Sequence, residues 1–423
     1  MLDIKYIREH AEEVKENIRR RRGNFDVDEL LRLDEERLTQ LHAIEALRKE
    51  RNDIAEQMKN AGASDRPKLI EHGKALKEKI AQLEGVFSGI DQHWVDLMLR
   101  VPNKTHPETP AGESDEENTV MKMVGEVRRP GFTPFSHIEL AAKHDLIDFE
   151  RGAKVSGAKF YFLKGKLALL EQALIRYGID FAMKEGFEFL ATPDVAKEEV
   201  LIGKGFLPRG PETQVYYIEK SDLALIGTAE ITVLGYHMNE VLAREDLPKK
   251  YVAFSHCFRT EGGAYGRESY GLYRVHQFSK VEMLAFAAPD QSEAVHIEFL
   301  RIEENFWQSL GIPYRIVDCC AGDLGGSDYR RYDIEAWMWG KGEGKGGWGE
   351  VTSTSNCIDF QSRGLNIKQN SKEGEKDFVH TLNGTVVATP RALLCILENF
   401  QQADGSIMIP EVLRPYCGFD KIG

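Results

Sequence analysis

Two long stretches of helical periodicity occupy most of the first hundred residues. Apolar side chains recur at spacings of three and four over residues 38–58, with one gap at Arg51, and over residues 69–97 without a gap. The segment between them, NAGASDRP at residues 60–67, contains Gly, Ser, Asp and Pro, which together end a helix. Two heptad-patterned helices joined by a tight turn form an antiparallel coiled-coil hairpin, here over residues 26–100. At ~1.5 Å per residue, about 33 residues per helix give a rod on the order of 50 Å.

The charge of this hairpin differs from that of the rest of the chain. A formal net charge of −13 argues, as an average, against general nucleic-acid binding. Residues 46–80 instead contain nine Lys or Arg against six Asp or Glu, so the distal half of the rod is basic. Such hairpins serve more often for dimerisation, but here the heptad positions are satisfied within the hairpin, which favours docking of a nucleic acid. The candidate contacts are Arg48, Lys49, Arg51, Lys74 and Lys77.

The remaining composition is that of an ordinary globular protein, with 42% hydrophobic and 29% charged residues. The amino terminus is charged throughout and lacks the apolar core of a secretory signal, and no apolar run approaches the roughly 18 residues of a membrane span. The six cysteines show no CxxC spacing, so we interpret them as reduced thiols and expect no zinc site. We therefore predict a cytoplasmic protein without membrane contact.

The composition of the chain changes after the hairpin. Residues 101–118 are rich in Pro, Glu and small polar residues and are interpreted as a linker. We predict an N-terminal helical arm at residues 1–105 and a second domain at residues 106–423. Near the start of that domain, an amphipathic helix over residues 166–186 precedes a short strand, residues 187–192, that a proline ends.

Residues 254–284 have the pattern of two antiparallel strands joined by a long charged loop. Arg259 and Glu261 close the first predicted strand. Because side chains two apart on a strand face the same way, three residues of the second strand share one face, namely Arg274, Phe278 and Glu282. A cation, an aromatic ring and a carboxylate together suit a nucleotide and an ammonium group. The alternative is a charged edge hairpin with a buried phenylalanine.

Further polar groups occur at the ends of the predicted strands that surround this hairpin. Residues 228–230, Thr-Ala-Glu, end an apolar strand, and residues 350–353, Glu-Val-Thr-Ser, begin another. Residues 340–349 are rich in glycine but lack the GK[ST] of a phosphate loop, so they are interpreted as a flexible connection. Pro390 begins a helix, which places Arg391 where a helix already favours anions.

The segments FRTE and GLYRVHQFSKVE closely resemble motif 2 of the class II aminoacyl-tRNA synthetases, in the form found in seryl-tRNA synthetases. The helix and strand at residues 166–192 resemble motif 1, the dimer-forming element of that class. With TAE, EVTS and NGTVVATPR, the resemblance covers essentially the whole chain. It implies an α+β fold, in which a two-helix coiled-coil arm precedes a catalytic antiparallel sheet flanked by helices.

The resemblance also implies an activity. The enzyme would use ATP and Mg²⁺ to convert L-serine into seryl-adenylate, and would transfer serine to tRNA(Ser), with tRNA(Sec) as a further acceptor left open. It would be a homodimer. The short stretch after Arg391 leaves no room for an anticodon-binding module, so the hairpin is expected to recognise the long variable arm of the tRNA.

Site residues follow from the resemblance, position by position. Arg259 and Arg391 would be catalytic, because Arg259 bridges the α-phosphate and the serine carboxylate while Arg391 clamps the γ-phosphate. The residues implied to surround serine are Thr228, Ala229, Glu230, Arg259, Glu282, Asn383 and Thr385. Those implied to contact ATP are Arg259, Thr260, Glu261, Arg274, Val275, Phe278, Glu350, Val351, Thr352, Ser353 and Arg391. Among these, Glu261 and Phe278 would hold adenine, while Glu350 and Ser353 would hold Mg²⁺.

The chain departs from the family pattern at two places. Thr385 stands where serine is usual, followed by VVATP in place of a glycine-rich run, and Gly364 replaces the second of two arginines. Two other functions compete with the synthetase. An amino-acid:carrier-protein ligase of the same fold should lack the basic hairpin, and a non-catalytic paralogue or coiled-coil scaffold should lack some of the ATP-binding residues.

Overall fold

The computed structural model describes residues 1–127, 129–206, 214–261, 271–370 and 376–423. These residues form two compact units, Leu2–Pro102 and Asn103–Gly423, and Met1 belongs to the second unit. Within the described ranges, no helix combines the length and the apolar content needed to cross a membrane.

The first unit contains two short and two long helices, α1 (Ile4–Glu9), α2 (Ala11–Arg20), α3 (Val27–Asn60) and α4 (Arg66–Arg100). The first 22 residues contain the two short helices, which meet at His10. Helix α3 starts where the Asp26 carboxylate accepts hydrogen bonds from two backbone N–H groups of its first turn, and Pro67 lies in the first turn of α4.

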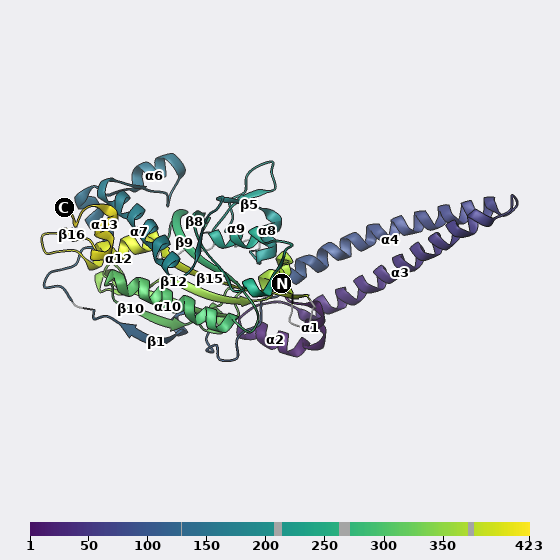
Figure 1. Cartoon of the computed structure of the whole chain (residues 1–423), viewed down its shortest axis with the longest axis horizontal. Coiled ribbons are helices and arrows are strands. Elements are labelled where there is room, and N and C mark those ends of the chain that lie inside the picture. The colour runs from purple at the N-terminus through teal and green to yellow at the C-terminus, as the bar shows by residue number, and fades with distance from the viewer. Residues whose placement is uncertain (128, 207–213, 262–270, 371–375) are drawn as a thin grey trace. The chain divides into compact units, whose positions relative to one another are not determined.

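The two long helices lie side by side and are joined by a short turn at their far end (Figure 1). The predicted heptad positions are the ones that face the partner helix. Ile44 and Ile54 of α3 are buried, as are Leu76, Ile80 and Leu97 of α4. The coiled-coil hairpin is thus confirmed, and its length follows from the 34 and 35 residues of its two helices.

The second unit is built on an eight-stranded sheet. Its strand order is β1 (Thr119–Val124), β10 (Tyr314–Asp318), β11 (Arg330–Met338), β12 (Gly347–Ile358), β15 (His380–Ala388), β9 (Gln277–Ala287), β8 (Lys249–Phe258) and β4 (Glu188–Ala191). Every neighbouring pair is antiparallel except β4 with β8. The predicted antiparallel sheet is confirmed.

Smaller elements surround this sheet. The minor strands are β2 (Ile147–Asp148), β3 (Phe162–Leu163), β5 (Val195–Lys197), β6 (Leu223–Leu225), β7 (Val241–Leu242), β13 (Lys368–Asn370), β14 (Lys376–Phe378), β16 (Ile407–Met408) and β17 (Lys421–Ile422). The helices are α5 (His137–His144), α6 (Phe149–Ser156), α7 (Gly165–Lys184), α8 (Glu198–Lys204), α9 (Ala229–Tyr236), α10 (Ser292–Leu310), α11 (Phe360–Leu365), α12 (Thr389–Asn399) and α13 (Arg414–Cys417). The helix and strand resembling motif 1 are α7 and β4.

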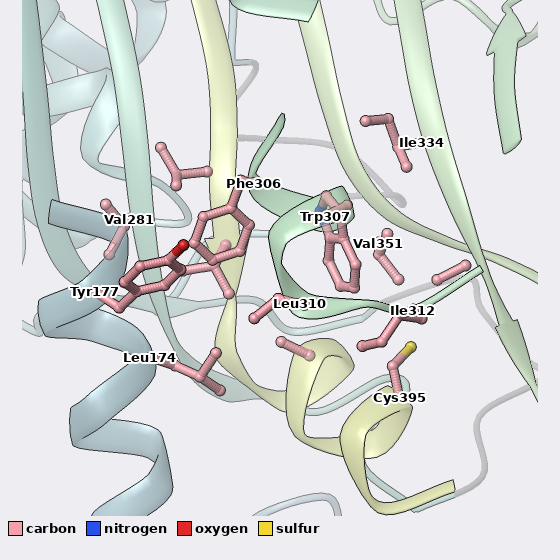
Figure 2. Packing of buried hydrophobic residues seen from close by; sticks show 14 of the residues in the cluster. Leu174, Tyr177, Val281, Phe306, Trp307, Leu310, Ile312, Ile334, Val351 and Cys395 are labelled. Atoms are coloured by element: carbon pink, nitrogen blue, oxygen red, sulfur yellow. The ribbon is translucent and has the colours of Figure 1, made fainter. Parts of the chain in front are cut away.

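One face of the sheet carries the main core. Alternate residues of β9 point toward helices α7, α10 and α12, and Figure 2 shows Val281 of β9 near Tyr177 of α7 and Phe306 of α10. The intervening residues of β9 face the other way. Near its end, Leu284 and Phe286 join a second apolar cluster with α9. The start of β9 on this second face, from residue 278 to residue 282, is therefore left for polar chemistry.

The segment interpreted as a linker is partly packed. The Asn103 backbone N–H donates to the Gly326 carbonyl at 2.8 Å, and its side-chain amide donates to the carbonyls of Ser327 and Cys357 at 2.8 and 2.9 Å. Asn103 is fully buried. The proline- and glutamate-rich composition predicted a linker, but one buried asparagine, which donates to three backbone carbonyls, fixes the start of this segment to the second unit.

The predicted strand boundaries around the loop need correction. β8 ends at Phe258, so Arg259 and Glu261 follow the strand, and Glu261 has a φ of 52°, in the left-handed region, where a strand cannot continue. β9 begins at Gln277, so Arg274 precedes it. The shared strand face therefore holds for Phe278 and Glu282 but not for Arg274. Residues 262–270 of the predicted loop lie outside the described residues.

Candidate active site

A cavity of about 550 Å³ opens on the second face of the sheet. It is lined by every residue predicted to bind serine or ATP except Ala229 and Thr260. Ala229 is fully buried in the apolar cluster beneath α9, and the Thr260 N–H donates to the Gln214 carbonyl at 3.2 Å. Segments more than 150 residues apart in the sequence thus meet in one place.

One part of the cavity combines a guanidinium and an aromatic ring. The guanidinium carbon of Arg259 lies 5.3 Å from the centre of the Phe278 ring, and two of its nitrogens face the Gly227 carbonyl at 3.3 Å. Arg274 forms an ion pair with Glu261 at 3.1 Å, although neither residue is in a strand. Because both side chains line the same cavity as Phe278, the predicted grouping is present despite the wrong strand boundaries.

A second guanidinium lies at the start of α12. Arg391 donates to the Glu350 backbone carbonyl at 2.9 Å and pairs with its carboxylate at 3.1 Å, and the ring of Tyr273 lies 4.8 Å from its guanidinium carbon. Burial would raise the pKa of Glu350, but Arg391, Arg331 and Arg259 outweigh it and lower that pKa. The Glu350 carboxylate is therefore ionised and lies among guanidinium groups. These cations also make this part of the cavity favourable for a bound anion.

A bulge in β12 brings Glu350 and Ser353 into the same cavity. Residues three apart on a regular strand face opposite sides, but the register of β12 on β11 shifts by one residue between positions 350 and 352. Both side chains consequently line the cavity. Their carboxylate and hydroxyl oxygens are the type of ligand that Mg²⁺ prefers, so the donor set fits the ion.

A neighbouring group of potential metal ligands is already neutralised by a protein cation. Cys319, Asp323 and Asp333 place ligand atoms within 4.8 Å of one another. The Arg331 guanidinium lies among them and donates to the Cys319 sulfur at 3.3 Å and to the Asp333 carboxylate at 3.0 Å. It also pairs with Asp323. The guanidinium of Arg331 thus contacts all three of these groups and supplies positive charge beside them.

The carboxylates of the predicted serine site have several donors each. One oxygen of Glu230 accepts from the amides of Gln361 and Asn383 at 2.7 and 3.0 Å, and the other pairs with Lys204 at 3.0 Å. Glu230 lies in the first turn of α9, because the Thr228 hydroxyl caps that helix and ends the preceding extended segment; the predicted strand end at residues 228–230 was wrong.

Glu282 forms the opposite side of this part of the cavity. It accepts a hydrogen bond from the Thr385 hydroxyl at 3.0 Å and forms an ion pair with Lys280. Thr385 lies directly opposite Glu282 in the pairing of β15 with β9, which explains the contact. Glu230 and Glu282 are both at least 95% buried, so each needs these partners to compensate for the water that its carboxyl group has lost.

Several residues of the cavity were missed from the sequence. Lys280 shares a strand face with Phe278 and Glu282, and the alternation that identified those two could have identified it. Lys204 lies at the end of α8 and carries no motif. Burial acts to lower the pKa of Lys204, but the Glu230 carboxylate and further nearby groups reverse this effect and raise it. Arg331 of the cavity lining was also missed, as was Gln361, which does not line the cavity but donates to Glu230, because only the tertiary packing brings them to the site.

The departure at residue 364 has a packing reason. Gly364 of α11 lies against Gly203 of α8, and a Cβ on Gly364 would come within 2.0 Å of the Gly203 carbonyl oxygen. No larger side chain fits there. Arg363 pairs with Asp359 at 2.6 Å and does not line the cavity.

The predicted nucleic-acid contacts of the arm lie on its surface. All five are exposed. Arg48 forms an ion pair with Glu84 at 2.8 Å across the two helices, whereas Lys49, Arg51, Lys74 and Lys77 take part in no ion pair among the described residues. Arg48 therefore has a partner within the arm that competes with any external phosphate.

Comparison with known proteins agrees with these observations. Residues 1–105 match the family model of the seryl-tRNA synthetase N-terminal domain, and residues 215–400 match that of the class II tRNA synthetase core domain (G, H, P, S and T). The serine–tRNA ligase of Treponema denticola is 50% identical, covering 100% of both chains. That of Dictyoglomus turgidum is 48% identical, covering 100% of this chain and 99% of the relative.

Solved structures are similar over the same length. The seryl-tRNA synthetase of Pyrococcus horikoshii complexed with ATP has a TM-score of 0.85 and 37% identity, covering 100% of this chain and 99% of the other. The cytoplasmic serine–tRNA ligase of Naegleria fowleri in complex with AMP has a TM-score of 0.83 and 32% identity, covering 100% and 98%. The resemblance seen in the motifs is confirmed over the full length, and the chain therefore belongs to the seryl-tRNA synthetases, the serine–tRNA ligases among the class II aminoacyl-tRNA synthetases.

Proposed function

We propose that this enzyme activates L-serine with ATP to form seryl-adenylate and then transfers serine to tRNA(Ser). The observation that carries the proposal is the composition of this cavity. Guanidinium groups and Phe278 lie at the nucleotide end, and two buried carboxylates lie at the amino-acid end. Arg259 lies beside Phe278 and also faces the Gly227 carbonyl, just before the predicted serine residues, so it can hold the reacting phosphate between the two substrates.

The chemistry needs charge neutralisation more than proton transfer. The serine carboxylate attacks the α-phosphorus of ATP and displaces pyrophosphate, so two anions must be brought together in line. Arg259 would bridge the α-phosphate and the serine carboxylate, and Arg391 would bind the γ-phosphate. Glu350 and Ser353 would hold Mg²⁺, which supplies further positive charge to the phosphates when bound. No general base is required, because the attacking carboxylate is already ionised.

The remaining predicted contacts would lie at the nucleotide end and at the amino-acid end of the cavity. Phe278 would stack on adenine and Glu261 would accept from its amino group, close to Thr260, Arg274 and the backbone of Val275. Val351 and Thr352 would flank the metal ligands. At the other end, Glu230 and Glu282 would bind the serine ammonium and hydroxyl, between Thr228, Asn383 and Thr385.

Serine selectivity would come from hydrogen bonding on one side and a closed wall on the other. A site whose buried groups hydrogen-bond the substrate hydroxyl rejects alanine strongly, because those groups would lose their partner. Rejection of threonine needs a wall that leaves no room for a methyl group. The Thr385 methyl, held in place by the hydrogen bond from its hydroxyl to Glu282, is suited to that task.

ATP–pyrophosphate exchange across the twenty amino acids tests this function. We expect exchange to depend on serine, with alanine and threonine lower by at least about 10²-fold. Exchange that depends on another amino acid, or that fails with all of them, would refute the proposed substrate. The carrier-protein ligase would show serine or alanine exchange without tRNA charging, but it should lack the basic hairpin that this chain has.

Glu282→Ala should lower serine-dependent exchange by about 10²-fold, because the serine ammonium or hydroxyl loses a buried charged partner. The effect should fall on the KM for serine more than on the KM for ATP. Glu282→Gln is the matched variant, since it keeps the shape and the acceptor for Thr385 but removes the charge. Its serine-dependent exchange should lie between that of the wild type and that of Glu282→Ala. Serine kinetics like those of the wild type in Glu282→Ala would remove this residue from the site.

We further propose that the enzyme is a homodimer through α7 and β4. Among the described residues β4 pairs only with β8, which leaves its other edge available to a second chain. Leu169 and Met183 of α7 and Phe189 of β4 are 54%, 48% and 39% exposed. Sedimentation velocity should give the mass of two chains. A monomer that retains full exchange activity would show that the dimer is not needed.

The arm is proposed to bind tRNA. Its exposed basic residues can contact phosphates along a rod on the order of 50 Å, which gauges the shape of an RNA without reading its bases. Such a rod suits the long variable arm of tRNA(Ser), and the same recognition would admit tRNA(Sec). A cytoplasmic location remains a prediction from the sequence.

A further inference from the structure

Helix α10 carries a carboxyl group into the main core of the second unit. Its inward face is apolar, with Phe299, Ile302 and Phe306 fully buried, and Figure 2 shows Phe306 and Trp307 of this helix pointing among the core side chains. Glu303 lies on the same helix and is also fully buried. It takes part in no ion pair among the described residues. A buried carboxyl without a cation needs an explanation.

The carboxyl of Glu303 lies against the back of the predicted serine site. Its Oε2 accepts a hydrogen bond from the Thr352 hydroxyl of β12 at 3.1 Å. Its Oε1 faces Gly384 of β15 so closely that a Cβ there would lie 2.8 Å from it. Glu303 therefore contacts both strands from the helix-covered face, whereas Thr385 and Glu282 meet on the face that lines the cavity.

This contact falls where the two strands stop pairing. The ladder between β12 and β15 runs from Ile358 and Thr381 to Thr354 and Gly384, and no pair follows. Beyond that point β12 contains its bulge and β15 contains Thr385. Both strands line the cavity there, and no backbone pair between these described residues joins them. The Glu303 carboxyl lies beside this unpaired stretch, with one oxygen bonded to the Thr352 hydroxyl and the other close to Gly384.

The environment favours the uncharged form of this acid. Burial raises the pKa of Glu303 well above its ordinary value, and the carboxylates of Glu282 and Asp333 act in the same direction. The Thr352 hydroxyl and the backbone N–H of Thr385 oppose them only in part. No ion pair to a cation among the described residues offsets these effects, so the surroundings of Glu303 favour its protonated form.

We propose that Glu303 is a positioning residue of the amino-acid site, a buried side chain that bridges β12 and β15 behind the cavity and holds Thr385 against Glu282. The inference rests on the proposed serine site. Glu303 does not line the cavity and would touch no substrate, so its effect would pass through the position of Thr385. It would set the width of the pocket and thereby the rejection of threonine.

Two substitutions of similar shape test this role. Glu303→Gln keeps a neutral group that can accept from Thr352, so the KM for serine should stay within about threefold of wild type. Glu303→Leu removes the bridge, so the KM for serine should rise about tenfold and discrimination against threonine should fall about tenfold, while the KM for ATP changes less than about twofold. A general loss of packing would instead raise both KM values or lower kcat alone.

Three outcomes would overturn the inference. They are a Glu303→Gln variant as impaired as Glu303→Leu, a Glu303→Leu variant with unchanged serine KM, and a rise in the KM for ATP equal to that for serine. If Glu303→Leu does not fold, Glu303→Met replaces it as the variant that removes the bridge, because its flexible side chain fills irregular space, and the same limits apply. Wild-type enzyme that shows no serine-dependent exchange would refute the proposed function itself, whereas normal wild-type exchange with insensitive variants would refute only the role of Glu303.

Discussion

Arg391→Ala is expected to lower the rate of seryl-adenylate formation by about 10²- to 10³-fold, as measured by serine-dependent ATP–pyrophosphate exchange. Arg391 is fixed before any substrate arrives. Its guanidinium is held between the Glu350 carbonyl and carboxylate and the ring of Tyr273, at the start of a helix that itself favours anions. A cation fixed in this way stabilises the departing pyrophosphate without reorganising, so its removal should cost most in the rate of the first step.

The second step separates this role from a general loss of structure. Transfer of serine from preformed seryl-adenylate to tRNA occurs after pyrophosphate has left, so it should change less than about threefold in Arg391→Ala. Arg391→Lys should recover only part of the exchange rate, because a point charge cannot form the fork of contacts. Arg301→Ala, on an exposed ion pair of α10, is the control and should behave like wild type. Equal damage to both steps in Arg391→Ala would contradict the assigned role.

Shortening the arm should impair the charging of tRNA and spare the formation of seryl-adenylate, which is the opposite of the effect expected for Arg391→Ala. Replacement of residues 51–79 by a short glycine-containing turn should reduce tRNA charging by at least about 10²-fold and leave serine-dependent exchange within about twofold of wild type. The cut preserves the ion pair between Arg48 and Glu84, so the remaining helices keep a cross-connection. It removes Arg51, Lys74 and Lys77, which are exposed and take part in no ion pair among the described residues.

Point substitutions refine the test of the arm. Changing Arg51, Lys74 and Lys77 together to glutamine should weaken tRNA binding and make the dependence of log K on log salt shallower by about 0.9 for each lost phosphate contact. Arg48→Gln should weaken tRNA binding less, because Arg48 already has Glu84 as a partner. Loss of exchange activity in the shortened enzyme would show instead that the arm supports the catalytic unit.

The sequence predicted the elements whose periodicity decides their structure. The heptads of the arm required a helical hairpin, and the alternation in β9 required Phe278 and Glu282 to share a face. It failed where a local backbone feature changes the register. β8 ends at Phe258, so Arg259 and the left-handed Glu261 lie beyond the strand. The bulge in β12 brings both Glu350 and Ser353 to one cavity, whereas strand alternation alone would place them on opposite faces.

Residues that act through tertiary packing could not be found from the sequence. Lys204 reaches Glu230 because Gly203 of α8 packs on Gly364 of α11, more than 150 residues away along the chain. Glu303 is followed by Glu304 in a helix, and only the packing of that helix shows that Glu303 is fully buried while Glu304 is bonded near the surface. A glutamate in an amphipathic helix otherwise suggests the solvent face.

The most direct test of the account is to measure seryl-tRNA formation by the wild-type enzyme on three tRNAs. These are tRNA(Ser), tRNA(Ser) with a changed anticodon, and tRNA(Ser) without its long variable arm. We predict that serine is attached to the first two at similar rates and to the third at a rate lower by at least about 10²-fold. Failure to charge the unaltered tRNA(Ser) with serine, or a larger effect of the anticodon than of the variable arm, would contradict the proposed function or the proposed role of the arm, respectively.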